Sequence, residues 1–259
     1  MIGASDPADL GVVEAAILLR ERRLSAVELA EACLARIEDR NGGPPTFDGA
    51  SSAINAWVRL YPERAVEAAR LADQRRQRER DDAPLLCGVP IALKDIYGAA
   101  GLPLTASSRV LEGNVAERDA AVVAALRGEG MVVLGHTHTH EFAAGGTTDQ
   151  VGNPWSLEAT AGGSSGGSAA ALAAHMVPAA TGTDTAGSLR IPSALCATST
   201  IKPTRGLVSM TGIVPLAPSL DHAGPMARSV ADCAALLAVM AGPELADPRT
   251  AFATRAAWP

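Results

Sequence analysis

The first eighty residues show apolar positions at the spacing of amphipathic helices. Apolar residues in 26–40 recur every three or four positions. Ser25 and Glu28 form a capping box before this stretch, in which each side chain can bond the other residue's backbone N–H group. A second helical stretch, 62–80, begins with a proline, which is favoured in a first turn. We therefore expect residues 1–80 to be an N-terminal helical segment that packs on the core.

From residue 81 onward, short apolar stretches alternate with helical ones. The apolar stretches predict strands, and the amphipathic or alanine-rich stretches predict helices. The expected strands are 88–95, 131–135, 177–184 and 198–204. The expected helices are 119–130, 165–176 and 229–242, the last with Ser229 as its N-cap. This alternation indicates an α/β fold, in which helices cover both faces of a sheet.

Composition and charge narrow the class of protein. Of the 259 residues, 47% are apolar and 19% are charged. The charged share is below the average of about 25%, which indicates an ordered globular chain with much of its length buried. The net charge of −6, without a basic stripe, argues against direct binding of nucleic acid. No apolar run has the length of a membrane span, and the start lacks the pattern of a secretory signal. Four scattered cysteines fit a reducing cytoplasm.

Glycine and serine are concentrated in 161–193, on both sides of an alanine-rich stretch. Linkers share this composition but do not alternate with a packed helix and strand. A phosphate-binding loop would need a lysine after the glycines, and none follows here. A nucleophile elbow, G-x-S-x-G, does match Gly162–Gly166 with Ser164 as nucleophile, and Asp221 and His222 follow in chain order. That motif requires a strand entering the turn, whereas the preceding residues look turn-like.

The stretch also resembles the fingerprint of the amidase signature family, G-G-S-S-G-G-S, an apolar helix and G-T-D-T-G-G-S-x-R-x-P. Residues 162–192 match it almost position by position, and other family-like segments, such as GVPIALKDIYGAAGLPLTASS, occur in the family's order across 85–241. The resemblance implies the amidase signature fold, a mixed, largely parallel open sheet, for residues 81–259. Family chains are usually longer, so the C-terminal part of this core is expected to be incomplete.

The resemblance implies a Ser–cisSer–Lys catalytic unit. Its members map to Ser188 as nucleophile, Ser164 as proton relay and Lys94 as base. It also implies a cis peptide bond before Ser164. The oxyanion hole would consist of backbone N–H groups from Thr185, Ala186, Gly187 and Ser188. The family usually has glycine in place of Ala186, and a methyl group is tolerated there if φ is negative.

The chemistry of amide cleavage explains why these residue types are needed. A serine hydroxyl is a weak nucleophile until a base removes its proton. Lysine can be that base only when neutral, and half-neutrality near pH 7 requires about 4–5 kcal/mol of destabilisation of the ammonium. Burial can supply this. Lys94 ends a short apolar strand, so we expect its amine to point into a dry site.

Neighbouring residues are given structural roles. Ser165 and Ser168 are expected to cap the following helix, and Asp184 and Arg190 to brace the loop. The histidines of the alternating run 136–140 share one face of a strand, which can favour metal binding. Without cysteines or a carboxylate cluster nearby, we expect no metal there, and no cofactor elsewhere.

The sequence therefore predicts an amidase that cleaves linear amides through an acyl-enzyme. Its partners would be a small-molecule amide and, in a homodimer, a second copy, with no membrane contact. The first alternative is the A subunit of a tRNA-dependent amidotransferase, which releases ammonia from glutamine and would bind B and C subunits. The second is an inactive fragment or interaction module. Substrate-binding residues are not assigned.

Overall fold

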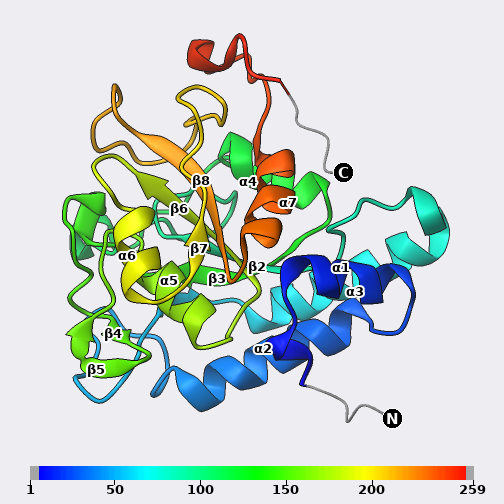
Figure 1. The fold of residues 1–259 in the computed structure, drawn as a ribbon, viewed down its shortest axis with the longest axis horizontal. Helices are drawn as coiled ribbons and strands as arrows, with labels where there is room; N and C mark the ends of the chain where they lie inside the picture. Colours follow the sequence, from blue (N-terminus) through cyan, green and yellow to red (C-terminus); the bar gives the residue numbers. More distant parts are fainter. Residues whose placement is uncertain (1–5, 255–259) are drawn as a thin grey trace.

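The computed structural model describes residues 6–254, and within them a six-stranded sheet runs through the molecule in the order β1-β3-β2-β6-β8-β7 (Figure 1). Its strands are β1 (Trp57–Leu60), β2 (Pro90–Lys94), β3 (Val132–Thr137), β6 (Ala179–Asp184), β7 (Ser199–Thr200) and β8 (His222–Ala227). In the centre, β2 pairs in parallel with β3 and β6, whereas the outer pairings are antiparallel. Because β7 is antiparallel to β8, and β8 to β6, four of the six strands run the same way. The expected mixed, largely parallel sheet is confirmed.

Helices cover both faces of this sheet, as predicted. The α-helices are α1 (Val12–Arg20), α2 (Ala26–Arg40), α3 (Pro62–Glu79), α4 (Ala121–Gly128), α5 (Gly166–Ala173), α6 (Arg190–Leu195) and α7 (Val230–Met240). Short 3-10 turns and a separate hairpin complete the described part: η1 (Pro7–Asp9), η2 (Arg80–Asp82), η3 (Arg109–Leu111), η4 (Glu141–Ala143), η5 (Pro248–Thr250), β4 (Gly152–Asn153) and β5 (Ser156–Thr160). Figure 1 shows α5 and α6 on one side of the sheet and α4 and α7 on the other.

The predicted helix starts are confirmed at α2 and α7. At α2, the Glu28 N–H donates to Ser25 Oγ (3.1 Å) and the Ser25 N–H donates to the Glu28 carboxylate (2.8 Å), which completes the capping box. At α7, Ser229 Oγ accepts from the Asp232 N–H (3.1 Å). The local sequence therefore fixes where these helices begin.

Two strands of the main sheet were not predicted. β1 lies in the segment expected to be helical and pairs with β3 at the sheet edge. β8 has the sequence HAGPMA, which contains two residue types that disfavour strands, Gly224 and Pro225. It nevertheless pairs with β6 along six residues. This pairing depends on the backbone of β6, which lies far from β8 in the sequence, so the local sequence of β8 does not predict it.

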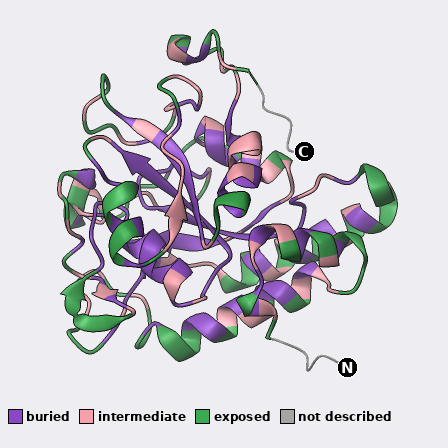
Figure 2. Cartoon of the chain, viewed as in Figure 1, coloured by how far each residue is buried: buried purple, intermediate pink, exposed green. Residues whose placement is uncertain are grey.

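Close packing of α5 against the sheet positions the glycine- and serine-rich stretch. Seven consecutive residues of α5 are buried, from Gly166 to Leu172 (Figure 2). A Cβ atom on Gly167 would lie 2.5 Å from both the Ala56 carbonyl oxygen and the His138 nitrogen. Only glycine allows this approach, so the start of α5 is held against the ends of β1 and β3.

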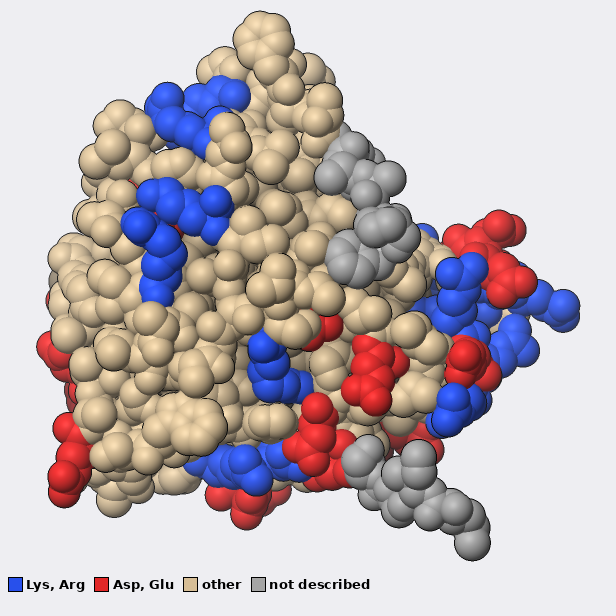
Figure 3. Space-filling model, in the orientation of Figure 1, with Lys and Arg blue, Asp and Glu red and all other residues tan. Residues whose placement is uncertain are grey.

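Charged side chains are unevenly distributed over the visible face. Figure 3 shows both blue and red side chains over α1, α2 and α3, whereas those visible near α6 and β8 are almost all blue. The area near the glycine- and serine-rich stretch therefore presents mainly Lys and Arg on this face. Within residues 6–254, none of the helices combines the length and apolar composition needed to cross a membrane.

Candidate active site

Lys94 ends the central strand β2, and its amine lies in a cluster of hydroxyl groups. The side chain is fully buried. Its Nζ atom is 2.7 Å from Ser164 Oγ, 2.8 Å from Thr183 Oγ1 and 3.0 Å from Ser165 Oγ. Three hydroxyls from two segments therefore surround one amine inside the molecule.

Burial changes the protonation of this amine. It lowers the pKa of Lys94 from its ordinary value of 10.5 to about 7, although the negative charges of Asp184 and Asp221 act in the opposite direction. The chain contains only one other lysine, Lys202, whose Nζ lies 2.9 Å from the Asp184 carboxylate. At neutral pH Lys94 is therefore poised to take up or release a proton.

The hydroxyl partners decide where the lone pair of neutral Lys94 points. A neutral amine has two N–H donors and one lone pair. If Ser165 Oγ and Thr183 Oγ1 accept the two N–H groups, the lone pair faces the Ser164 hydroxyl. Ser165 Oγ is itself held between the N–H (3.3 Å) and carbonyl (3.4 Å) groups of Thr183. This arrangement suits proton transfer from Ser164 to Lys94.

The expected capping roles of Ser165 and Ser168 are wrong. Ser165 occupies the N-cap position of α5 but makes no side-chain cap hydrogen bond, since its hydroxyl contacts Lys94. Ser168 Oγ donates to the Thr181 carbonyl (2.9 Å) and lies 2.8 Å from Thr137 Oγ1. Both hydroxyls form hydrogen bonds with groups of the sheet, and therefore do not bond the free N–H groups at the start of α5.

The turn before α5 fixes the position of Ser164. The peptide bond between Gly163 and Ser164 is cis, as expected. A Cβ atom on Gly163 would collide with the Thr147 carbonyl oxygen, so a larger residue does not fit. The Ser164 carbonyl accepts hydrogen bonds from the His140 N–H (3.0 Å) and from Thr148 Oγ1 (3.3 Å). The backbone is thus held before Ser164 by the packing of Gly163 and after it by the hydrogen bonds of the Ser164 carbonyl.

Ser188 lies beside this turn, at the end of the loop that follows β6. Its carbonyl accepts a hydrogen bond from the Ser165 N–H (3.3 Å), and 8% of its surface is exposed. Gly187 has a φ of 153°, and a Cβ atom there would lie 2.7 Å from the Ile191 side chain. Within residues 6–254, the residues other than glycine with positive φ do not include Ala186, so its methyl group is tolerated.

Charged residues brace this loop, as predicted for Asp184 and Arg190. The buried Asp184 carboxylate accepts hydrogen bonds from Arg190 (3.0 and 3.1 Å) and pairs with Lys202. Burial disfavours its charge, but these contacts outweigh burial and lower the pKa of Asp184 to about 2. Thr185 Oγ1 donates to Asp221 (2.5 Å), which holds the other side of the loop.

The three histidines of the run 136–140 contact different groups. His136 Nδ1 lies 2.9 Å from the Tyr61 hydroxyl, whereas the ring nitrogens of His138 and His140 donate to backbone carbonyls (2.8 and 2.9 Å). Burial lowers the pKa of His136, and that of His138 to about 4. Among residues 6–254, no group of three or more His, Cys, Asp or Glu side chains is arranged to hold a metal ion.

The geometry does not favour the nucleophile-elbow interpretation. The residues before the turn, which looked turn-like, do form the strand β5, but it pairs only with β4 outside the main sheet. His222 Nδ1 lies 2.6 Å from the Leu220 carbonyl oxygen and 3.2 Å from that of Asp184, whereas the Ser164 hydroxyl contacts Lys94.

Sequence reasoning missed the contacts of Ser165 and Thr183 with Lys94. Thr181 and Thr183 lie two positions apart in β6, so both face the same side of the sheet. Thr181 Oγ1 accepts from the Lys94 backbone N–H (2.9 Å), and Thr183, two residues further along β6, contacts the Lys94 amine. This spacing was the available signal.

Comparisons with known proteins found a matching family model and similar curated sequences. A family model described as Amidase matches residues 45–256. The A subunit of glutamyl-tRNA(Gln) amidotransferase from Chloroflexus aurantiacus is 47% identical over 245 residues, which are 93% of this chain and 47% of the relative. The corresponding protein of Methylococcus capsulatus is 44% identical over 236 residues, which are 89% of this chain and 46% of the relative. The chain thus spans about half the length of the curated relatives it matches.

Solved structures show the same fold. The peptide amidase of Stenotrophomonas maltophilia superposes with a TM-score of 0.85 and 36% identity, over 97% of this chain and 52% of the amidase. A 6-aminohexanoate cyclic dimer hydrolase superposes with a TM-score of 0.82 and 34% identity, over 98% of this chain and 50% of the hydrolase.

Proposed function

Because this chain belongs to the amidase family, we propose that it hydrolyses a linear amide through an acyl-enzyme on Ser188. The observation that supports this proposal best is the environment of Lys94. Its fully buried amine has a pKa lowered to about 7 and lies 2.7 Å from the Ser164 hydroxyl. A buried amine whose neutral form is well populated near pH 7 is the base that serine chemistry requires.

The proposed reaction begins when Ser188 Oγ attacks the amide carbonyl carbon. Its proton passes to Ser164, whose own proton passes to Lys94. The carbonyl oxygen becomes an oxyanion, which backbone N–H groups of residues 185–188 stabilise. Lys94 then returns a proton through Ser164 to the leaving amine as the C–N bond breaks. Water attacks the resulting ester, and the same groups remove and return its proton.

The test is hydroxamate formation from a panel of short linear amides, because hydroxylamine intercepts an acyl-enzyme. Ser188→Ala should lower the rate by at least about 1,000-fold. Ser193→Ala is the matched control, since this buried serine of α6 has a hydroxyl without a hydrogen-bond partner among residues 6–254. Undiminished hydroxamate formation in Ser188→Ala would show that the nucleophile is another residue.

A second candidate function is the release of ammonia from glutamine for a tRNA-dependent amidotransferase. The supporting observation is the 47% identity to the A subunit of a glutamyl-tRNA(Gln) amidotransferase. This role predicts glutaminase activity that appears only when B and C subunits are added. Hydrolysis of simple amides by the chain alone, with no response to those two proteins, favours the first function.

A non-catalytic binding role makes a different prediction. A chain that melts cooperatively yet forms no hydroxamate from any amide, alone or with the B and C subunits, would be a folded interaction module. Circular dichroism during heating distinguishes that outcome from an unfolded sample.

A further inference from the structure

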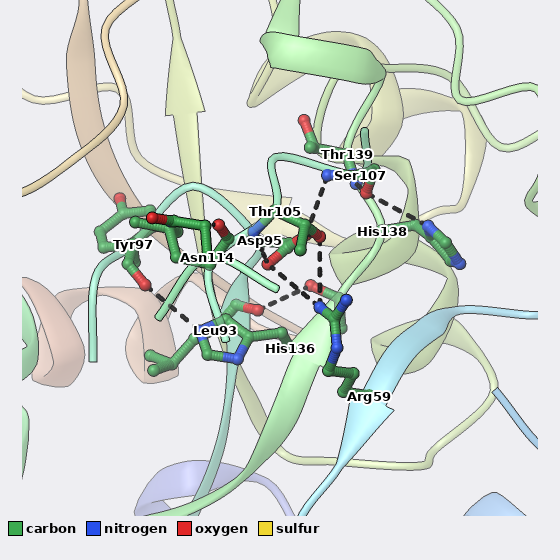
Figure 4. Close-up of polar contacts among 12 residues, drawn as sticks. Arg59, Leu93, Asp95, Tyr97, Thr105, Ser107, Asn114, His136, His138 and Thr139 are labelled. Atoms are coloured by element: carbon green, nitrogen blue, oxygen red, sulfur yellow. Dashed lines mark hydrogen bonds and ion pairs between the residues drawn. The ribbon is translucent and has the colours of Figure 1, made fainter. Parts of the chain in front are cut away.

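Asp95, directly after Lys94, is the centre of a buried polar cluster (Figure 4). Its backbone N–H donates to a carbonyl at the end of β3 (3.0 Å). Its carboxylate accepts hydrogen bonds from Thr105 Oγ1 (2.5 Å) and the Ser107 N–H (2.8 Å), and Arg59 Nη1 lies 4.0 Å away. A buried carboxylate requires such partners. The strand that carries the lysine is therefore tied to the loop 105–107.

This loop has a backbone conformation that its residues do not favour. Ala106 and Ser107 both have a φ of 51°, in the left-handed region that non-glycine residues rarely adopt. Such a conformation is strained for these residues and persists only where surrounding contacts hold it. The Asp95 carboxylate provides those contacts at both ends, through Thr105 and Ser107.

The same loop holds the segment that fixes Ser164. Ser107 Oγ accepts from the Thr139 N–H (3.0 Å), and the Ala106 carbonyl accepts from the Phe142 N–H (3.0 Å). Between these two anchor points, the His140 N–H donates to the Ser164 carbonyl (3.0 Å). A continuous series of hydrogen bonds thus runs from Asp95, through the loop 105–107, to the turn that carries Ser164.

We propose that Asp95 is a positioning residue that keeps the Lys94 amine and the Ser164 hydroxyl at hydrogen-bond distance. This inference rests on the proposed function of these two groups. They are 70 positions apart in sequence, and Asp95 acts on both sides: it adjoins Lys94 in the chain and anchors the loop that holds the Ser164 turn. Without the carboxylate, the loop relaxes from its left-handed conformation, the turn shifts, and water reaches the amine.

The first test compares the full chain with Asp95→Asn and Ser107→Ala. The matched control is Asp232→Asn, which alters a buried carboxylate that accepts from the Val13 N–H (2.8 Å) between α1 and α7. With an amide that the native chain hydrolyses, Asp95→Asn should lower kcat by about 100-fold with little change in KM. The acidic limb of its pH–rate profile should move to higher pH, because water stabilises the ammonium.

The second test needs no turnover. Lysine labelled with carbon-13 gives NMR signals from only two residues, Lys94 and Lys202. The pKa of Lys94 measured by NMR should be higher in Asp95→Asn and Ser107→Ala than in the native chain or Asp232→Asn. If the native chain hydrolyses no amide, the proposed function fails while this titration still tests the positioning.

Three outcomes decide the proposal. A raised pKa of Lys94 in a folded Asp95→Asn chain supports it. An unchanged pKa, together with an unchanged kcat where one is measurable, overturns it. If Asp95→Asn does not fold, Ser107→Ala decides in the same way, because it removes the link to Thr139 and leaves the Asp95 carboxylate intact.

Discussion

At the scale of single residues, Lys94 makes activity depend on pH. Its pKa is lowered to about 7, and only the neutral amine can accept a proton. We expect kcat/KM to rise through pH 7 and to level off about one unit above it. A pH–rate profile on an amide substrate measures this limb. A limb near the ordinary lysine pKa of 10.5 would contradict the assignment of Lys94 as base.

The same residue links stability to pH. The pKa of Lys94 is about 7 in the folded chain and 10.5 when exposed, so the unfolded chain binds more protons between these values. The free energy of unfolding should therefore rise with pH across this window, by about 1.4 kcal/mol per unit from this group. Urea unfolding of the native chain and of Lys94→Met isolates the effect. Parallel pH dependences in the two proteins would contradict it.

At the scale of elements, the packing of α5 depends on glycine. Gly167→Ala places a methyl group 2.5 Å from the Ala56 carbonyl oxygen, just before β1, and from the His138 nitrogen, just after β3. We therefore expect the free energy of unfolding to fall by about 1–3 kcal/mol. Gly128→Ala is the matched control, because a Cβ atom at this end of α4 meets nothing within 4 Å. Alanine should be neutral or stabilising there. Equal unfolding free energies for the two variants would refute the packing argument.

The elements also show what local sequence can and cannot predict. The capping box of α2 and the apolar strand ending at Lys94 carry their own signals, and both were predicted. β8 was missed because HAGPMA forms a strand only through its pairing with β6 and β7. Ser165 was assigned as a cap because the local sequence cannot show that Lys94 arrives from another strand. The positions of Lys94, Ser164 and Ser188 came from a motif resemblance, whereas their contacts required the register of the sheet.

At the scale of the whole molecule, two buried carboxylates join distant segments. Asp184 ties β6 to α6 and Lys202, and Asp247 ties the segment near residue 249 to the Met210 N–H (2.9 Å). Burial disfavours both charges, but hydrogen bonds from arginine and lysine or backbone groups lower each pKa to about 2. A lowered folded pKa contributes stability above about pH 4, which is lost as the pH falls toward about 2.

Thermal melting at several pH values checks this expectation. The midpoint of the native chain should fall between about pH 4 and about pH 2, and Asp247→Asn should melt lower at about pH 7 with a shallower fall in acid. Asp48→Asn, which alters an exposed carboxylate, should follow the native curve. An Asp247→Asn curve that runs parallel to the native curve would contradict the linkage.

The scarcity of lysine gives the folded chain one more property. Of its two lysines, Lys94 is the last residue of β2 and Lys202 pairs with the buried Asp184 carboxylate, although arginines are abundant. A protease that cuts only after lysine can cleave a folded protein only where several residues around the lysine are accessible in an extended conformation. Cleavage after residue 94 therefore requires the middle of the sheet to open, and the rate of that single cut would report how often the molecule does so.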